Sequence, residues 1–176
     1  MPKVLYLMCG PAGTGKSTFV ANEILADNVN CCHHSSRDNI CFAMVKEDEN
    51  YFAREDEVFD EFCKDIQRCL DSAAYDIVYA DATHLTSKSR VKTLNKLNLE
   101  GVDVVPIYFV IPLEETLRRN SERTGRRLVP ETVIKNMYQS YKFPMFKENE
   151  YEYAAIRRID ENGHEIYITK EGIGYA

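Results

Sequence analysis

Short apolar runs alternate along the chain with longer segments whose apolar residues recur every three or four positions. The runs at residues 4–9, 77–81 and 102–111 have the length of strands and are apolar almost throughout, which is typical of strands buried on both faces of a sheet. The clearest helical pattern spans residues 55–74, where acids separate seven apolar positions: Val58, Phe59, Phe62, Cys63, Ile66, Cys69 and Leu70. This alternation predicts an α/β fold in which helices cover a mostly parallel central sheet.

Weaker patterns complete the expected order of elements. A helix is predicted from Ser17 to about residue 27, then a strand over residues 28–34 and a loop at residues 35–38 that enters a helix at Asn39. Three later helices are predicted, at residues 86–97, from residue 112 through the arginines that follow it, and at residues 130–141.

The dipeptide Asn162-Gly163 separates two strand-like runs, residues 155–160 and 164–169. Such a dipeptide is a strong signal for a two-residue hairpin turn because both residues tolerate positive φ. We expect a C-terminal β-hairpin at an edge of the sheet, outside any catalytic site.

Composition and length set limits on this picture. At 176 residues, with 44% apolar and 28% charged side chains, residues 1–176 are expected to form a single domain. No apolar run approaches the ~20 residues that span a membrane, and residues 4–9 are too short for the core of a signal peptide. A cytoplasmic location without membrane partners is therefore expected, and the sequence does not indicate an oligomeric state.

The six cysteines show no paired C-x-x-C arrangement and no histidine partners at zinc spacing. They are expected to be reduced, partly buried thiols. The sequence Cys-Cys-His-His at residues 31–34 raises the alternative of a metal cluster. Adjacent residues on a strand point to opposite faces, however, and cannot easily converge on one ion.

One motif between the first predicted strand and helix carries recognisable chemistry. It fits the phosphate-loop pattern G-x-x-x-x-G-K-[ST] without mismatch and consists of Gly10, Pro11, Ala12, Gly13, Thr14, Gly15, Lys16, Ser17 and Thr18. Its glycines allow backbone N–H groups to point at phosphate oxygens, next to the positive end of the following helix. Lys16 is expected to reach the β- and γ-phosphates of ATP and Ser17 to hold Mg²⁺. The alternative is a glycine turn without a ligand.

Two aspartates follow predicted strands. The ligands of an open parallel sheet lie beyond the carboxyl ends of its strands, so Asp38 and Asp81 are expected to face the same crevice as the phosphate loop. Asp81 is expected to act as a second Mg²⁺-associated group. The alternatives are that Asp38 only caps a helix and that Asp81 only forms a turn.

Charge is distributed unevenly. The net charge is −6, so the chain as a whole lacks the positive charge typical of a nucleic-acid coat protein. Residues 47–71 carry a net charge of −7, whereas residues 114–147 carry a net charge of +4. An arginine-bearing lid is expected around residues 118–130, the arginine segment, where Arg119 and Arg123 share one helical face if the helix extends that far. There they would neutralise charge on the transferred phosphoryl group, the alternative being a solvated basic helix end.

The order of these motifs resembles the kinase domain of polynucleotide 5′-hydroxyl kinases. The matching segments are Gly-Pro-Ala-Gly-Thr-Gly-Lys-Ser at 10–17, Ser-Arg-Asp at 36–38, Asp-Ala-Thr-His-Leu at 81–85, Leu-Arg-Arg-Asn-Ser-Glu-Arg at 117–123 and Val-Pro-Glu at 129–131. The resemblance covers roughly residues 3–160 and implies a three-layer P-loop NTPase-type fold.

This resemblance implies a role for each matching residue. Asp38 would be the general base that accepts the proton of the acceptor hydroxyl, and Arg119 and Arg123 would be the lid arginines. The chain departs from the family at Cys41, where the bacteriophage enzyme has an arginine that grips the acceptor's phosphate, and at His84, where relatives often have asparagine.

The expected function is therefore an ATP- and Mg²⁺-dependent kinase that phosphorylates a hydroxyl group, such as the 5′ end of a polynucleotide. Two alternatives remain open. One is a small-molecule or nucleotide-sugar kinase, which belongs to the same superfamily and is consistent with Cys41 and the acidic net charge. The other is a switch that binds and hydrolyses ATP without phosphorylating an acceptor.

Overall fold

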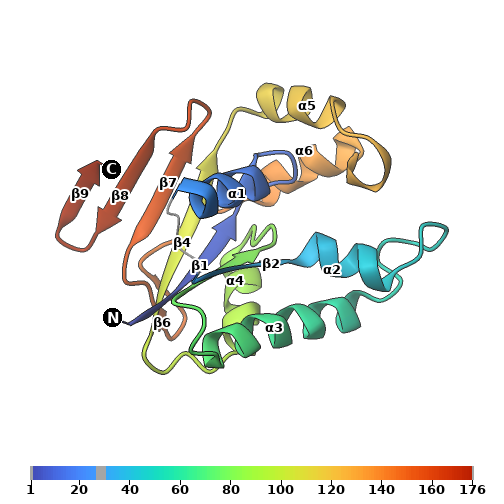
Figure 1. Cartoon of the computed structure of the whole chain (residues 1–176). Helices are drawn as coiled ribbons and strands as arrows, with labels where there is room; N and C mark the ends of the chain where they lie inside the picture. Colours follow the sequence, from blue (N-terminus) through green and yellow to red (C-terminus); the bar gives the residue numbers. More distant parts are fainter. Residues whose placement is uncertain (1, 27–30, 176) are drawn as a thin grey trace.

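The computed structural model describes residues 2–26 and 31–175 and has a seven-stranded sheet at its centre (Figure 1). The strands, in spatial order, are β2 (Cys32–Ser36), β3 (Ile77–Asp81), β1 (Lys3–Cys9), β4 (Val102–Val110), β7 (Ile156–Asp160), β8 (Glu165–Thr169) and β9 (Gly172–Tyr175). The first five are mutually parallel, and β8 and β9 add antiparallel strands at one side. The predicted mostly parallel sheet and the C-terminal hairpin are confirmed.

Helices cover both faces of this sheet. They are α1 (Lys16–Ala26), α2 (Arg37–Met44), α3 (Glu55–Asp71), α4 (Ser87–Leu94), α5 (Leu113–Ser121) and α6 (Glu131–Ser140), with a 3₁₀ turn at Gly125–Arg127. A separate small sheet consists of β5 (Lys147–Glu148) and β6 (Tyr151–Glu152). No helix among the described residues has the length and apolarity needed to cross a bilayer.

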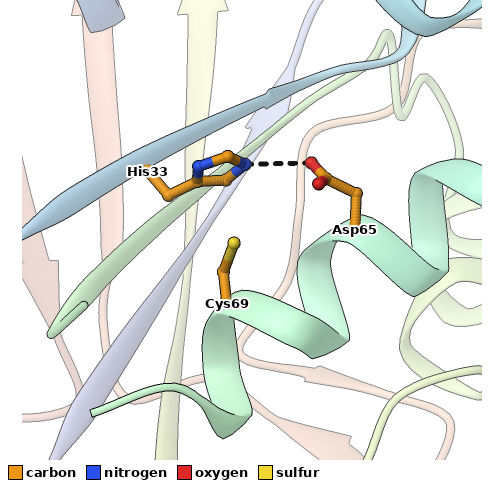
Figure 2. A group of neighbouring side chains, drawn as sticks. All are labelled: His33, Asp65 and Cys69. Carbon is orange, nitrogen blue, oxygen red and sulfur yellow. Dashed lines mark hydrogen bonds and ion pairs between the residues drawn. The ribbon is translucent and has the colours of Figure 1, made fainter. Parts of the chain in front are cut away.

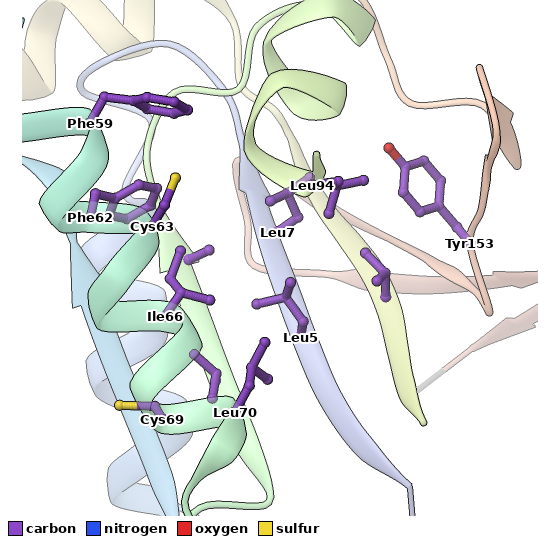
Figure 3. Close-up of a cluster of buried hydrophobic side chains, with 13 residues drawn as sticks. Leu5, Leu7, Phe59, Phe62, Cys63, Ile66, Cys69, Leu70, Leu94 and Tyr153 are labelled. Carbon is purple, nitrogen blue, oxygen red and sulfur yellow. The ribbon is translucent and has the colours of Figure 1, made fainter. Parts of the chain in front are cut away.

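Alternate residues of the central strands pack against different helices. Leu5 and Leu7 of β1 join the side chains of α3 in one buried cluster, which Figure 3 shows between that helix and the sheet. Met8 belongs to a second cluster that includes Val20 of α1. All seven apolar positions predicted for α3 are buried, so its heptad-like pattern identified the packed face correctly.

The predicted loop at residues 35–38 is wrong. Strand β2 continues to Ser36, which pairs with Asp81 of β3, and α2 begins at the next residue. The Ser36 side chain accepts a hydrogen bond from the Asn39 backbone N–H and caps the helix, so the strand passes directly into the helix. Of the strand predicted over residues 28–34, positions 28–30 lie outside the described residues, as does position 27 of the preceding helix.

Two other predictions need correction. The hairpin is not a mere edge appendage, because β7 pairs in parallel with β4 inside the sheet and β9 forms the outer strand. Helix α5 ends at Ser121, so Arg123 lies beyond it and does not share a helical face with Arg119. Three strands were not predicted, because their sequences lack a periodic apolar pattern: β5, β6 and β9. Helix α4 is shorter than the helix predicted at residues 86–97.

Candidate active site

The phosphate loop connects the carboxyl end of β1 to the first turn of α1. Gly13 and Gly15 have φ values of 91° and 96°, which side chains of L-residues rarely adopt. A Cβ atom on Gly13 would lie 3.0 Å from Thr116 Cγ2 and 3.2 Å from the Thr116 carbonyl oxygen. The close approach of α5 and the backbone conformation therefore both require glycine at position 13.

Side chains within the loop are tied to its own backbone. Lys16 is only 8% exposed, and its ammonium donates to the carbonyl oxygens of Gly10 at 2.8 Å and Pro11 at 2.9 Å. The buried Thr14 hydroxyl donates to the Pro11 carbonyl at 2.9 Å, and the Gly10 backbone N–H donates to the Thr83 carbonyl at 2.8 Å. These bonds hold the loop around a buried cation at the end of β1.

Ser17, Asp81 and His34 form a second group beside the loop. The Ser17 hydroxyl donates to Asp81 Oδ2 at 2.6 Å, and His34 Nε2 lies 3.0 Å from the same oxygen. Burial raises the pKa of Asp81, but bonds from His34 and Ser17 and the charge of Lys16 outweigh it, so the net pKa is lowered. The group holds a buried carboxylate in its ionised form next to a hydroxyl, and these are the oxygen ligands that Mg²⁺ prefers.

Asp38 lies in the first turn of α2, exposed to solvent. It is not the cap of this helix, because Ser36 has that role. The Tyr51 hydroxyl donates to Asp38 Oδ1 at 2.6 Å. Burial, and then the Asp38 charge and this hydrogen bond, raise the pKa of Tyr51, so Tyr51 remains a donor at neutral pH.

The charges of Asp81, Asp38 and Arg123 all act on Lys16. Burial lowers the pKa of Lys16, the two aspartates raise it, and Arg123 lowers it, with a net decrease. Arg123 is half-buried, and burial lowers its pKa while Asp38 and Asp81 oppose this effect. These four residues come from four different segments, and the fold brings their charges within interaction range of one another.

Arg119 projects from the last turn of α5 toward the phosphate loop. Its Nη1 donates to the Thr14 carbonyl at 3.4 Å, its Nε to Glu115 at 2.7 Å and its Nη2 to the Glu161 carbonyl at 3.2 Å. Arg123 instead donates to the Arg127 carbonyl at 3.4 Å. The two arginines thus approach the site from a helix and from the loop after it.

A cavity of about 620 Å³ lies between the end of α2 and the arginine segment. The guanidinium groups of Arg126 and Arg127 lie over the Phe42 ring, with Cζ atoms 4.7 and 5.6 Å from its centroid. One nitrogen of Arg126, Nη2, is buried without a hydrogen-bond partner. Arg127 also donates to Asn39 at 3.1 Å, which links this cavity to the turn that carries Asp38.

The two residues that differ from the polynucleotide kinase pattern, His84 and Cys41, are both buried in the fold. His84 is buried, bonds to the Met8 carbonyl at 2.8 Å and to the Thr93 hydroxyl at 3.1 Å, and adopts a φ of 39°. Burial lowers the pKa of His84 to about 4, so the imidazole is neutral. Cys41 is buried and packs with Val45 and Val58.

Sequence reasoning missed three contributors to this region. Tyr51 was not singled out. His34 was considered only as part of a metal cluster with its sequence neighbours, but it bonds to Asp81, whereas His33 bonds to Asp65. Asn120 is buried and closes the arginine segment by bonding to both the N–H and the carbonyl of Val129. The alternation of strand residues separated the two histidines but did not identify their partners, and no local signal identifies Asn120.

Comparisons with known proteins agree with this geometry. The sequence matches the AAA domain family over residues 5–144, more than half of the chain, so the chain belongs to this family. No curated protein matches the sequence significantly.

Solved structures with the same fold include three kinases. A fungal RNA kinase has a TM-score of 0.63 and 16% identity, with 89% of this chain and 73% of that chain covered. A sugar kinase from Janibacter sp. has a TM-score of 0.61 and 15% identity, with 91% and 86% covered. The APS kinase CysC of Mycobacterium tuberculosis, in complex with AMPPNP and APS, has a TM-score of 0.59 and 14% identity, with 92% and 90% covered. The P-loop kinase-like fold expected from the motifs is thus confirmed.

Proposed function

We propose that this member of the AAA domain family is an ATP-dependent kinase that transfers the γ-phosphoryl group of ATP to a hydroxyl acceptor. The observation that carries the proposal is the phosphate loop with Lys16 buried in it and Ser17 bonded to Asp81 at 2.6 Å, where the charges of Asp38, Asp81 and Arg123 also act on Lys16. Phosphoryl transfer needs a cation at the donor phosphates, an oxygen ligand for a metal, a base at the acceptor and a cation at the transferred group. The two aspartates, Lys16 and Arg123 are of the required types. As part of the proposal, the chain forms a single kinase domain that acts in the cytoplasm.

Residues 10–18 would bind the phosphates of ATP. Their backbone N–H groups and the N-terminus of α1 suit an anion, and the Lys16 ammonium would exchange its bonds to the Gly10 and Pro11 carbonyls for bonds to phosphate oxygens. Ser17 and Asp81 would hold Mg²⁺, since their oxygens already meet at 2.6 Å. When bound, Mg²⁺ would neutralise charge on the phosphate oxygens.

Asp38 would accept the proton of the attacking hydroxyl. Tyr51 bonds to its Oδ1, which orients the carboxylate, and Oδ2 would receive the proton. Arg123, helped by Arg119, would stabilise the negative charge that spreads over the transferred group. As a half-buried cation, Arg123 would interact more strongly with this charge than a fully solvated side chain could.

The cavity between the end of α2 and the arginine segment favours an anionic acceptor such as the 5′ end of a nucleic acid. Its lining has three cations, Lys46, Arg126 and Arg127, against one acid, Glu47, and this excess of positive charge suits phosphates. The ring of Phe42 suits a base. A small-molecule kinase is the second candidate. It is supported by the acidic stretch at residues 47–71, which would repel a long polyanion, and by neighbours described as sugar and APS kinases.

An acceptor panel with γ-labelled ATP tests the proposal. The panel contains 5′-hydroxyl DNA and RNA, nucleosides and sugars, and label is expected on the nucleic-acid ends. Transfer only to a sugar or nucleoside would favour the second candidate. Label found only as free phosphate would favour an ATP-hydrolysing switch and would contradict the kinase proposal.

Asp38→Asn isolates the role of the base. Asparagine retains an oxygen for the Tyr51 hydrogen bond but cannot accept a proton, so transfer should fall by ~10²–10⁴-fold while ATP affinity changes little. Asp48→Asn, which removes an exposed acid from the turn after α2, is the matched control and should keep full transfer. Retained transfer in a folded Asp38→Asn protein would show that Asp38 is not the base.

A further inference from the structure

Three side chains of types that bind metals meet between β2 and α3. They are His33 of β2 and Asp65 and Cys69 of α3 (Figure 2). One ligand atom from each lies within 4.8 Å of the other two, and His33 Nε2 lies 2.9 Å from Asp65 Oδ2. The three residues offer a nitrogen, an oxygen and a sulfur to one point between a strand and a helix.

Local geometry explains why these three side chains converge. Asp65 and Cys69 are four residues apart on α3, so they lie on the same face one turn from each other. His33 projects from β2 toward that face, and its ring packs against Tyr75 with centroids 5.3 Å apart. Helical i,i+4 spacing combined with one residue from another element is a common way to assemble a chelating site.

A buried hydroxyl beside the group is also unsatisfied. Ser35 lies two residues after His33 on β2 and therefore on the same face of the strand. Its Oγ is buried and has no hydrogen-bond partner that meets normal geometry. It lies beside Asp65. A buried polar atom without a partner is uncommon and often marks a site that binds a water or an ion.

We propose that His33, Asp65 and Cys69 form a zinc site in which a water takes the fourth position. Zinc binds tetrahedrally to nitrogen at about 2.0–2.1 Å and to thiolate at about 2.3 Å, so neighbouring ligand atoms lie roughly 3–4 Å apart. The observed group needs only small side-chain shifts to reach that arrangement. Mg²⁺ and Ca²⁺ prefer oxygen ligands and do not suit the Cys69 sulfur.

The surroundings permit a cation at this position. Lys3 and Arg68 are positive groups whose charges act on Cys69. Arg68 bonds to the other oxygen of Asp65, Oδ1, at 3.3 Å and has a side chain that is 65% exposed. It can therefore turn into solvent. Zinc would displace the proton of the Cys69 thiol, so binding should release a proton.

The site would connect β2 to α3, two elements that are otherwise joined here by the His33–Asp65 contact. Strand β2 passes directly into the turn that carries Asp38. Zinc would therefore stabilise the strand that leads to the proposed catalytic base. This inference does not depend on the proposed kinase activity, because metal binding is measured without any substrate.

Binding of Co²⁺ and Zn²⁺ to the purified full chain tests the site. Wild type should bind one Co²⁺ per chain with a thiolate-to-cobalt charge-transfer absorption, which Zn²⁺ then displaces. Cys69→Ala should lose this absorption, whereas Cys63→Ala, which removes a buried thiol of the same helix that packs in the core, should retain it. Competition with a chromophoric chelator should show that Cys69→Ala weakens Zn²⁺ binding by more than the about 10- to 100-fold associated with an outer-shell partner.

His33→Gln provides a second test in case Cys69→Ala unfolds. The His33 side chain is partly exposed, so this variant should remain folded. Zn²⁺ should raise the Tm of wild type and of Cys63→Ala but not that of His33→Gln. Absence of stoichiometric binding to wild type, or unchanged affinity in both Cys69→Ala and His33→Gln, would overturn the proposal.

Discussion

The phosphate loop and the arginine segment contact each other through Arg119 and Thr14, yet they are held in the fold by different means. The loop lies between a buried strand and a helix, and its Thr14 and Lys16 side chains are buried. The arginine segment is mainly exposed, with a side-chain exposure of 58% at Arg118, and much of its anchoring comes from the buried Asn120.

This difference shows how the two halves of the proposed site can serve different steps. The loop is organised in advance by glycine backbone conformations and bonds within a few residues, so it can bind phosphates with little rearrangement. The arginine segment depends on contacts with residues far away in sequence, such as Arg126 with the carbonyl oxygens of Phe42 and Val45. Segments with few buried contacts open more easily, which suits a lid that closes on the acceptor.

Of the substitutions that compare these two regions, Lys16→Ala should have the largest effect, because it removes the buried cation of the phosphate loop. Phosphoryl transfer should fall by about 10²–10³-fold, the loss found when one preorganised electrostatic donor is removed. Lys135→Ala, at an exposed lysine of α6, is the control and should keep full activity. Near-normal transfer by a folded Lys16→Ala protein would remove the assignment of residues 10–18 as the phosphate site.

Arg123→Ala tests the arginine segment. The single-turnover rate should fall by about 10²-fold while the equilibrium affinity for ATP changes much less, because the arginine would act mainly on the transition state. Arg119 would share this role, so the effects of the two substitutions need not add.

The control for this experiment is Arg118→Ala, since Arg118 is exposed and bonds to Glu115 and Glu122. It should change neither quantity. If Arg123→Ala lowers rate and affinity equally, Arg123 binds the ground-state phosphates and the segment is not a lid for the chemical step.

His84→Asn should change how the free energy of unfolding depends on pH in the acid range. The pKa of His84 is about 4, against an ordinary value of 6.5, and burial is the largest cause of this decrease. The charges of Arg37 and Arg90 also lower the pKa, whereas the Met8 carbonyl and the charge of Asp81 raise it. Between pH 6.5 and 4 the unfolded chain binds a proton at His84 and the folded chain does not. The contribution of neutral His84 to the free energy of unfolding is therefore complete above pH 6.5 and decreases as the pH falls to 4. The total is roughly 3 kcal/mol.

Asparagine should be tolerated at position 84, because it adopts positive φ readily and can donate to the Met8 carbonyl. Urea unfolding at several pH values between 7 and 4 measures the effect. The free energy of unfolding of wild type should decline more steeply than that of His84→Asn over this range. Parallel curves would show that His84 does not titrate as its burial indicates.

Asn120→Ala should have the smallest effect and act on the arginine segment. It leaves both the N–H and the carbonyl of Val129 without these partners, so the protein should lose about 1–3 kcal/mol of stability. Protease cleavage within residues 121–128 should become faster, while hydrogen exchange at the phosphate loop stays unchanged. Asn136→Ala, at an exposed position on α6, is the control. Equal protection of the segment in both variants would show that Asn120 does not anchor it.

The confirmed sequence predictions concern elements whose pattern lies within one continuous stretch of the chain. The strand predicted at residues 77–81 has these bounds in the structure, and every apolar position predicted for α3 is buried. Hydrophobic burial follows the period of the secondary structure, so a clear period identifies both the element and its packed face.

The incorrect predictions concern places where distant residues decide the local structure. Residues 35–38 look polar enough for a loop, but pairing of Ser36 with Asp81 extends β2 to the first residue of α2. Helix α5 ends at Ser121, although the arginine spacing allows it to continue, and Asn120 then bonds to Val129 across the segment. For β2 a long-range contact outweighs a weak local preference, and for α5 the chain turns so that residues nine positions apart bond to each other.

The sequence alone thus determined the α/β class, the phosphate-loop motif and the strand ends at which polar groups gather. Tertiary structure decided which groups meet there. Ser17 and His34 bond to Asp81 across 64 and 47 residues, and His33 meets Asp65 across 32. Backbone preferences and apolar periodicity act over a few residues and are visible in the chain itself. A contact between side chains of distant segments depends on strand register and helix packing, which form only when the whole sheet is assembled.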